Sequence, residues 1–110
     1  MQMTGGQALA QSLKIEGVET IFALPGIQLD YLFDAIWEER DHFKVLHTRH
    51  EQATAYMADG FARSTGKIGT FIVVPGPGVL NATAALSTAY ACSSPVLCVN
   101  SPGRIRMGTV

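Results

Sequence analysis

The stretch IGTFIVVPGPGVLNATAALSTAYACSSPVLCVNSPG, residues 68–103, contains no charged residue and decides the fold class. Residues 69–74 and 96–100 are short apolar runs typical of buried strands, and residues 79–93 have the length of a helix. Prolines and glycines at 75–78 interrupt the stretch and polar residues dilute it, which excludes a membrane span. A strand, a helix and a strand in succession predict parallel strands joined by a right-handed crossover.

The rest of the chain repeats this alternation of helices and strands. We expect four helices and four parallel strands, with the strands at 20–24, 43–47, 69–74 and 96–100. The predicted fold is therefore α/β, an open, doubly wound, mostly parallel sheet with helices on both faces. Because residues 101–110 show no core pattern, we expect the chain to hold an incomplete domain.

The spacing of apolar residues predicts which helix faces are buried. Thr4 and Gln7 fit a capping box that begins the first helix, and the second helix should run to about Arg40. The fourth helix carries no charge, so we expect it to be covered on both sides, by its own sheet and by something beyond this chain. The predicted buried face of the second helix consists of Leu29, Leu32, Phe33, Ile36 and Trp37. That of the third helix consists of Ala53, Tyr56, Met57, Gly60 and Phe61.

The composition of the chain limits the classes of partner. The 110 residues carry a net charge of −1 with a pI near 6.2, which offers no electrostatic argument for nucleic acid or for an anionic membrane. Cys92 and Cys98 lie among apolar residues and form no CxxC pair, so we expect buried, reduced thiols. The chain does not open with a signal-peptide pattern, and we expect a cytoplasmic protein.

Unusual residues follow three of the predicted strands. Ligands of open parallel sheets bind beyond the carboxyl ends of the strands, so these residues should share one site. They are Leu24, Pro25 and Gly26 after the first strand, His50 and Glu51 after the second, and Val74 to Gly78 with Asn81 after the third. The first turn does not match the G-x-G-x-x-G pattern of dinucleotide sites.

A metal site is not expected in this chain. His47 and His50 are three residues apart, His42 precedes its strand, and no carboxylate cluster completes a ligand set. We expect His42 to be a solvent-facing turn residue, and His47 and His50 to be hydrogen-bonded or to lie at the edge of a site. Residues 75–78 should form a rigid loop, because prolines restrict the backbone.

Glu51 has two interpretations from pattern alone. Acidic residues are favoured in the first turn of a helix, where free N–H groups and the helix dipole attract negative charge. A carboxyl group at the tip of a strand–helix junction is also suited to proton transfer in a site. The pattern leaves both interpretations open.

Five segments together resemble one family over nearly the whole chain. They are LeuProGly at 24–26, ArgHisGluGln at 49–52, AlaAspGlyPheAlaArgSerThrGlyLys at 58–67, GlyProGlyValLeuAsn at 76–81, and residues 88–101. In this order they resemble the N-terminal, pyrimidine-binding domain of thiamine-diphosphate enzymes of the acetolactate synthase and 2-keto-acid decarboxylase type. The resemblance implies that residues 1–110 are the N-terminal part of such a domain, in a lyase or transferase whose central and diphosphate-binding domains lie outside this chain.

The resemblance implies a catalytic role for Glu51. Its carboxyl group would share a proton with N1′ of the aminopyrimidine ring and so favour the imino form that removes the C2 proton of the thiazolium. Desolvation would favour a protonated carboxyl, while the helix N-terminus would favour the anion. The implied cofactor-binding residues are Leu24, Pro25, Gly26, Glu51, Val74, Pro77 and Asn81, although the family often has a threonine or serine at the positions of Val74 and Pro75. Asn81 can equally be a polar residue of a first helical turn.

The resemblance also implies partners. The diphosphate group and its Mg²⁺ would be held by the missing domain, supplied by a second subunit of a homodimer or homotetramer, and the substrate would be a 2-keto acid. Residues 1–110 alone would then be inactive. One alternative is a split-subunit module that works with a separate diphosphate-domain chain. A non-catalytic assembly protein is a third possibility, which Glu51 argues against because such a protein could lose it.

Overall fold

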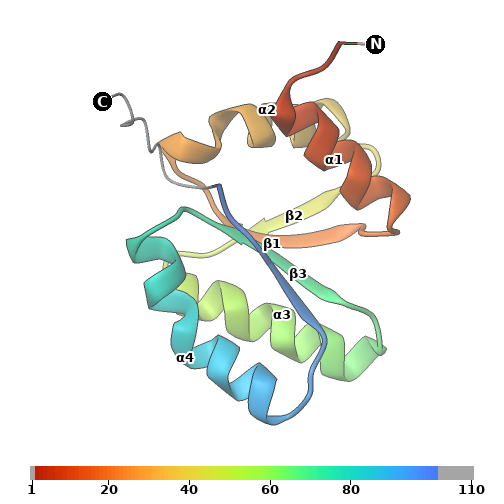
Figure 1. Ribbon diagram of the computed structural model, residues 1–110. Coiled ribbons are helices and arrows are strands. Elements are labelled where there is room, and N and C mark those ends of the chain that lie inside the picture. The colour runs from red at the N-terminus through yellow and green to blue at the C-terminus, as the bar shows by residue number, and fades with distance from the viewer. Residues whose placement is uncertain (1, 102–110) are drawn as a thin grey trace.

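The sheet consists of four parallel strands. The computed structural model describes residues 2–101, and Figure 1 shows the strands side by side in the order β2-β1-β3-β4. Each predicted strand is found to within one residue at either end, and the parallel pairing confirms the prediction. The strands are β1 (Thr20–Leu24), β2 (Lys44–His47), β3 (Gly69–Val73) and β4 (Val96–Val99).

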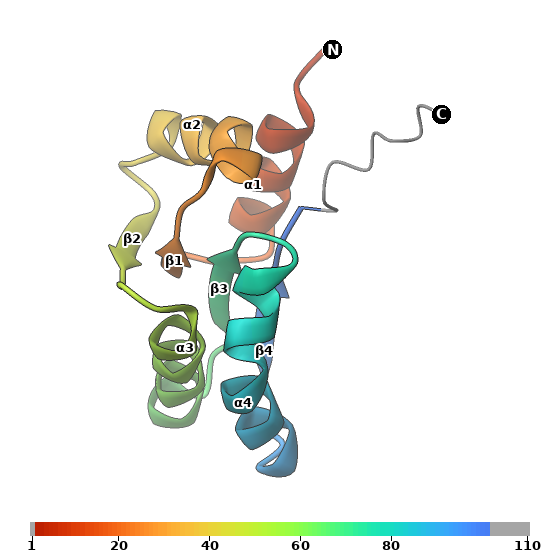
Figure 2. The same ribbon diagram turned by 90° about the vertical axis from the view of Figure 1, so that its left-hand side faces the viewer.

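Helices cover both faces of the sheet. α1 and α2 pack together on one face, and α3 and α4 pack together on the other (Figures 1 and 2). This arrangement confirms the doubly wound prediction. The elements are α1 (Gly5–Ile15), the short 3-10 helix η1 (Ile27–Leu29), α2 (Asp30–Glu38), α3 (Glu51–Thr65) and α4 (Pro77–Ala91). The predicted capping box is present, since the side chain of Thr4 accepts from the backbone N–H of Gln7 and the side chain of Gln7 accepts from that of Thr4.

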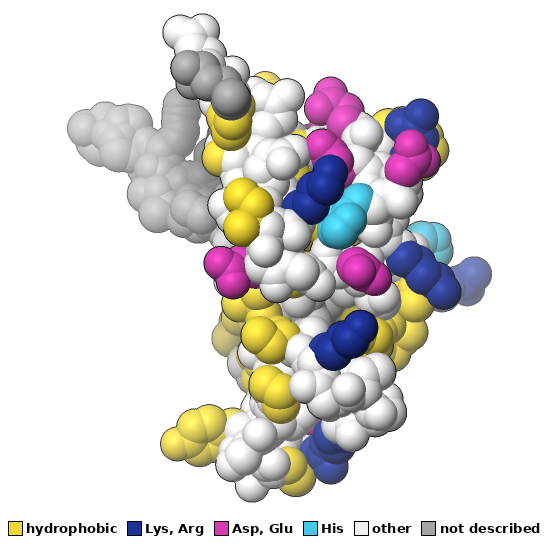
Figure 3. Space-filling view, turned by 90° about the vertical axis from the view of Figure 1, so that its right-hand side faces the viewer, with side chains coloured by type: hydrophobic (Ala, Val, Ile, Leu, Met, Phe, Trp, Pro, Cys, Tyr) yellow, Lys and Arg dark blue, Asp and Glu magenta, His cyan; other side chains and the backbone are white. Residues whose placement is uncertain are grey.

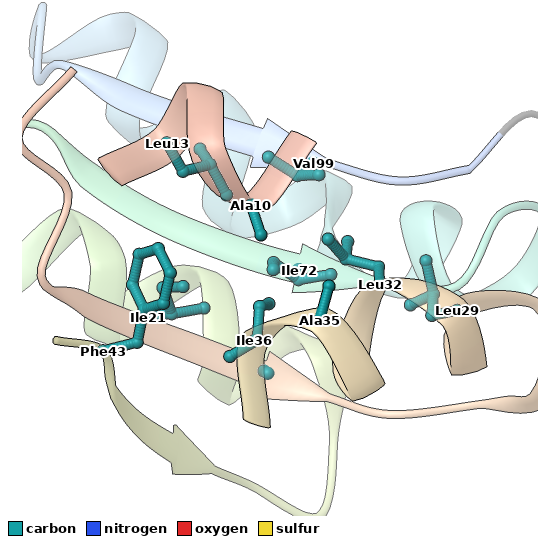
Figure 4. Packing of buried hydrophobic residues seen from close by; sticks show 11 residues of the cluster. Ala10, Leu13, Ile21, Leu29, Leu32, Ala35, Ile36, Phe43, Ile72 and Val99 are labelled. Atoms are coloured by element: carbon teal, nitrogen blue, oxygen red, sulfur yellow. The ribbon is translucent and has the colours of Figure 1, made fainter. Parts of the chain in front are cut away.

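Alternating side chains of the central strands build two cores. Ile72 of β3 faces α1 and α2, where it joins the cluster drawn in Figure 4. Phe71 and Val73, its neighbours along β3, face α3 and α4. On that second face the packing is very close, because a Cβ placed on Gly69 would lie 1.9 Å from the carbonyl oxygen of Ala58. The backbone of α3 therefore lies almost directly against the start of β3.

This close packing overturns the predicted buried face of α3. The buried residues are Thr54, Ala55, Ala58, Asp59 and Ala62, and the larger side chains predicted to be buried, Tyr56 and Met57, are each 40% exposed. Small side chains occupy the inner face because only they fit between α3, β3 and α4. The prediction was based on the hydrophobicity of the side chains, whereas the short distance between α3 and β3 determines which side chains are buried.

The predicted face of α2 is mostly confirmed. Leu29, Leu32 and Ile36 are buried, but Trp37 is 68% exposed. The guanidinium of Arg40 lies 4.8 Å from the centre of the Trp37 ring, a cation–π contact on the surface.

One face of α4 is covered within residues 2–101. Gly78, Ala82, Ala85 and Ala89 form its buried stripe, and α4 packs against α3. Ala82 and Ala85 also join a cluster with Phe71 and Val73 of β3. Leu80 and Tyr90, on the outer side, are 69% and 89% exposed. The predicted second cover of α4 is not supplied by the described part of the chain.

Two smaller expectations need correction. Cys92 is exposed and Cys98 is half-buried, so the thiols are not both buried; burial raises the pKa of the Cys98 thiol. His42 is half-buried rather than solvent-facing, and its Nε2 lies 2.9 Å from the carbonyl oxygen of Val18. Within residues 2–101, the helices are too short or too polar to cross a membrane.

Candidate functional site

The centre of the sheet contains a topological switch point. β1 and β3 are neighbours, but the chain leaves β1 towards α2 on one face and leaves β3 towards α4 on the other (Figure 2). Where two adjacent connections diverge in this way, a crevice opens beyond the carboxyl ends of the strands. Every site residue expected from the sequence lies at this end of the sheet.

The loops after β1 and β3 touch each other across this point. A Cβ placed on Gly26 would lie 2.3 Å from Cγ1 of Val74. The backbone of Gly26 is extended, so glycine is needed here for space rather than for its conformational freedom. Leu24 and Val74 are half-buried beside this contact, and Pro25 is exposed. Together they make an apolar rim at the end of the central strands.

Glu51 and Asn81 are hydrogen-bonded across two helices. Glu51 is the first residue of α3 and is half-buried. Asn81, in the second turn of α4, donates from Nδ2 to Oε2 of Glu51 at 3.1 Å. The packing of α3 against α4 brings the two side chains together, although they are thirty positions apart in the sequence.

Gly78 lies at the candidate site, at the end of the 74–78 segment that the sequence analysis expected there. It is buried, and a Cβ there would lie 2.7 Å from Cγ2 of Val74 and 3.6 Å from Oε1 of Glu51. The absence of a side chain lets the first turn of α4 approach both residues. The GlyProGly motif could be recognised in the sequence. That its second glycine makes room for Val74 and Glu51 could not be predicted, because this depends on how α4 packs.

The expected rigid loop at 75–78 is only partly a loop. Pro77 and Gly78 belong to the first turn of α4, and Pro77 occupies a position where its missing N–H costs nothing. Gly76 has φ +72° and ψ −116°, a backbone conformation that favours glycine. The turn at Pro75 and Gly76 therefore redirects the chain, and Pro77 enters the site from a helix.

The three histidines do not form a ligand set. His50 caps α3, accepting at Nδ1 from the N–H of Gln52 at 3.0 Å, which confirms that it is hydrogen-bonded. His47 is exposed on β2. In the described range 2–101, no group of histidine, cysteine or acidic side chains could hold a metal ion.

Comparison with known proteins decides the family. The chain matches the family model for the thiamine pyrophosphate enzyme, N-terminal TPP binding domain, over residues 3–105. The chain belongs to this family. The residues at the switch point are therefore part of a domain that binds thiamine pyrophosphate (thiamine diphosphate) in the family as a whole.

Relatives of this TPP-binding domain include synthases and a decarboxylase. The acetolactate synthase large subunit of Haemophilus influenzae is 42% identical over 90% of this chain and 17% of its own length. A probable acetolactate synthase large subunit of Methanocaldococcus jannaschii is 44% identical over 86% of this chain and 16% of its own length. A probable 2-ketoarginine decarboxylase of Pseudomonas aeruginosa is 41% identical over 90% of this chain and 17% of its own length. The chain thus spans only about a sixth of the length of these relatives.

Proposed function

We propose that this TPP-binding domain contributes Glu51 as the catalytic carboxyl of a thiamine-diphosphate enzyme acting on 2-keto acids. The reaction would be an acetolactate synthase-like carboligation or a decarboxylation, in keeping with the names of the relatives. The observation that carries the proposal is the position of Glu51, half-buried at the switch point with one carboxylate oxygen held by Asn81.

The residues at the switch point suit an aminopyrimidine ring. A flat heteroaromatic ring needs apolar walls and a polar group at its edge. Leu24, Pro25 and Gly26 would form one wall, and Val74 with Pro77 the other. Glu51 would meet a ring nitrogen at the edge, because its Oε1 makes no hydrogen bond within residues 2–101 while Oε2 is already occupied. The apolar walls and the carboxyl of Glu51 therefore fit an aminopyrimidine ring.

The pairing with Asn81 gives the two carboxylate oxygens different roles. Thiamine diphosphate, when bound, supplies a thiazolium carbon that reacts with the carbonyl of a 2-keto acid. An amide N–H donates to Oε2, so Oε2 is an acceptor and a proton on Glu51 belongs at Oε1. Asn81 thus orients the carboxyl, and Glu51 holds or releases a proton at the oxygen that faces the site.

The remaining parts of the cofactor would be held outside this chain. The proposal places the diphosphate group and Mg²⁺ on a diphosphate-binding domain of a second subunit in a cytoplasmic homodimer or homotetramer. Residues 1–110 alone would then be inactive. The uncovered side of α4, with Leu80 and Tyr90 exposed, supports an interface on this face of the domain.

A split-subunit module is the alternative, with the diphosphate domain on a separate chain. The relatives are about six times as long as the region they share with this chain, which favours a single long chain. The mass of the natural protein on a denaturing gel separates the two. A chain near 12 kDa that purifies with a partner would support the split module.

Calorimetric titration of the full natural protein with thiamine diphosphate and Mg²⁺ tests the proposal. We expect binding in the parent and weaker binding in Glu51→Gln. A matched control is Glu16→Gln, because Glu16 is exposed at the end of α1, just before the start of β1 and so away from the carboxyl ends of the strands. Equal affinity in the parent and Glu51→Gln would contradict the proposed role of Glu51.

A further inference from the structure

The turn that carries Glu51 is held by a hydrogen-bond network that the proposed chemistry does not explain. It connects β2 to α3 and contains Thr48, Arg49 and His50 before Glu51. The backbone N–H of Thr48 donates to the carbonyl of Ala23 at 3.2 Å, which ties the turn to β1. The network therefore begins on the central strand and ends at the residue next to Glu51.

His50 is bonded through both its side chain and its backbone. Its Nδ1 accepts from the N–H of Gln52 at 3.0 Å, which caps one of the free N–H groups of α3. Its carbonyl oxygen accepts from the hydroxyls of Thr48 and Thr54 at 2.9 and 3.2 Å, and from the N–H of Thr54 at 3.3 Å. The residues on either side of Glu51 are thus both fixed.

Thr54 closes the network from the buried side of α3. Its side chain is fully buried, and its hydroxyl contacts the hydroxyl of Thr48 as well as the carbonyl of His50. A buried hydroxyl is retained at a cost unless it is hydrogen-bonded. Small apolar residues, Ala55 and Ala58, fill the rest of this face, so an apolar side chain of the same size would serve for packing alone.

We propose that His50 and Thr54 are positioning residues for Glu51. Their hydrogen bonds fix the backbone before and after Glu51, and this keeps its carboxyl directed to the switch point and within reach of Asn81. The inference rests on the proposed function of Glu51. In this contact the imidazole caps α3 through Nδ1, which acts as an acceptor, so the ring N–H is on Nε2.

The test uses pairs of variants in the full natural protein. His50→Ala and Thr54→Val remove the bonding groups, while His50→Asn and Thr54→Ser keep a capping side chain and a hydroxyl. Thr65→Val is the matched control, because Thr65 accepts from the N–H of Lys67 at the opposite end of the same helix. Two quantities are measured: deuterium exchange of a peptide covering residues 48–57, by mass spectrometry, and the affinity for thiamine diphosphate with Mg²⁺.

We expect His50→Ala and Thr54→Val to raise exchange at 48–57 and to weaken cofactor binding, each about fivefold, the scale of a lost cap. His50→Asn and Thr54→Ser should restore both quantities, and Thr65→Val should change neither. Weaker binding in His50→Ala without faster exchange would overturn the proposal, since His50 would then act on the cofactor directly. Unchanged exchange and unchanged binding would overturn it as well.

Failure of the proposed function is distinguishable from failure of this inference. A parent protein that does not bind thiamine diphosphate contradicts the proposed function and the cofactor half of the inference. The exchange measurement needs no cofactor, and it still decides whether the network holds the backbone around Glu51.

Discussion

At the scale of single residues, the site depends on one contact between two helices. Asn81 donates to Glu51 from α4, and Gly78 makes room for the carboxyl from the same helix. α4 and its following strand carry no charge, so no ionic partner from this part of the chain competes for Glu51. An amide is well suited here, since it orients a carboxyl without adding a charge.

Asn81→Ala should weaken thiamine-diphosphate binding by about tenfold, because Oε2 of Glu51 loses its hydrogen-bond donor and the carboxyl can rotate. Titration calorimetry of the full natural protein measures the effect. Thr83→Ala is the control, since within residues 2–101 the hydroxyl of Thr83, on the same helix, bonds to the carbonyl of Leu80 and not to Glu51. Equal losses in the two variants would mean that damage to α4, rather than the contact with Glu51, is responsible.

From the sequence, the candidate site residues could be placed at one end of the sheet, but their contacts could not be predicted. Glu51, Val74 and Asn81 could be placed at strand ends, because parallel strands bring their carboxyl ends to one edge. The bond from Asn81 to Glu51 could not be predicted, since it depends on how closely α3 and α4 pack. The hydrogen bonds of Thr54 could not be predicted either, because they depend on the turn before α3.

At the scale of elements, the closeness of α3 to β3 governs stability. Gly69→Ala should destabilise the protein by at least about 2 kcal/mol, because its Cβ would overlap the carbonyl oxygen of Ala58 and neither backbone can move freely. Gly60→Ala on α3 is the matched control, with nothing within 4 Å of its Cβ, and should stabilise by about 0.5–1 kcal/mol. Denaturant unfolding measures both, and a mild effect of Gly69→Ala would contradict the described packing.

The ion pair within α3 should make stability depend on pH. Arg63 lies 2.9 Å from the buried Asp59, and its hydrogen bond holds the pKa of that carboxyl below its usual value. A lowered folded-state pKa means that the contribution is complete above the unfolded pKa, about 3.9, and is lost as pH falls through the folded value. Between pH 6 and pH 3 the parent should therefore lose more unfolding free energy than Asp59→Asn. Equal losses would show that the pair contributes nothing.

The spacing of apolar residues predicted the buried face of α2 better than that of α3. The stripe of α2 was mostly predicted correctly, because Leu32 and Ile36 are large and are buried in one cluster with Ile21 and Ile72 of the sheet. The face of α3 was predicted wrongly, because the large side chains of Tyr56 and Met57 were expected inside, whereas alanines are buried there. Hydrophobicity cannot reveal that two elements approach so closely that only small side chains fit.

At the scale of the whole molecule, charged and hydrophobic side chains are distributed unevenly over the surface of the domain. Figure 3 shows that acidic side chains on one side of the molecule gather over the half towards α1 and α2, while hydrophobic side chains are exposed below them. The outer side of α4 adds Leu80 and Tyr90 to the exposed apolar surface. The alternating order of strands and helices made the topology predictable from sequence. Residues 2–101 supply no cover for the outer side of α4.

Residues 1–110 expressed alone should therefore self-associate, since uncharged apolar surface is exposed on α4. Leu80→Glu should reduce the association by placing a charge on this face. Ile15→Glu is the control, because Ile15 is equally exposed at the end of α1, on the other side of the sheet. Sedimentation velocity measures the three proteins, and a monomeric parent would contradict the proposed interface.

The central claim is that the carboxyl of Glu51 activates the bound cofactor, and exchange of the cofactor's C2 proton with deuterium tests it most directly. The measurement compares the full natural protein with Glu51→Gln, using NMR after acid quench with the cofactor saturating. We predict exchange about 10²-fold slower in Glu51→Gln, the scale of a lost acid–base step, with stability changed by about 1 kcal/mol or less. An unchanged exchange rate with the cofactor fully bound would contradict the account and leave Glu51 as a helix-starting residue.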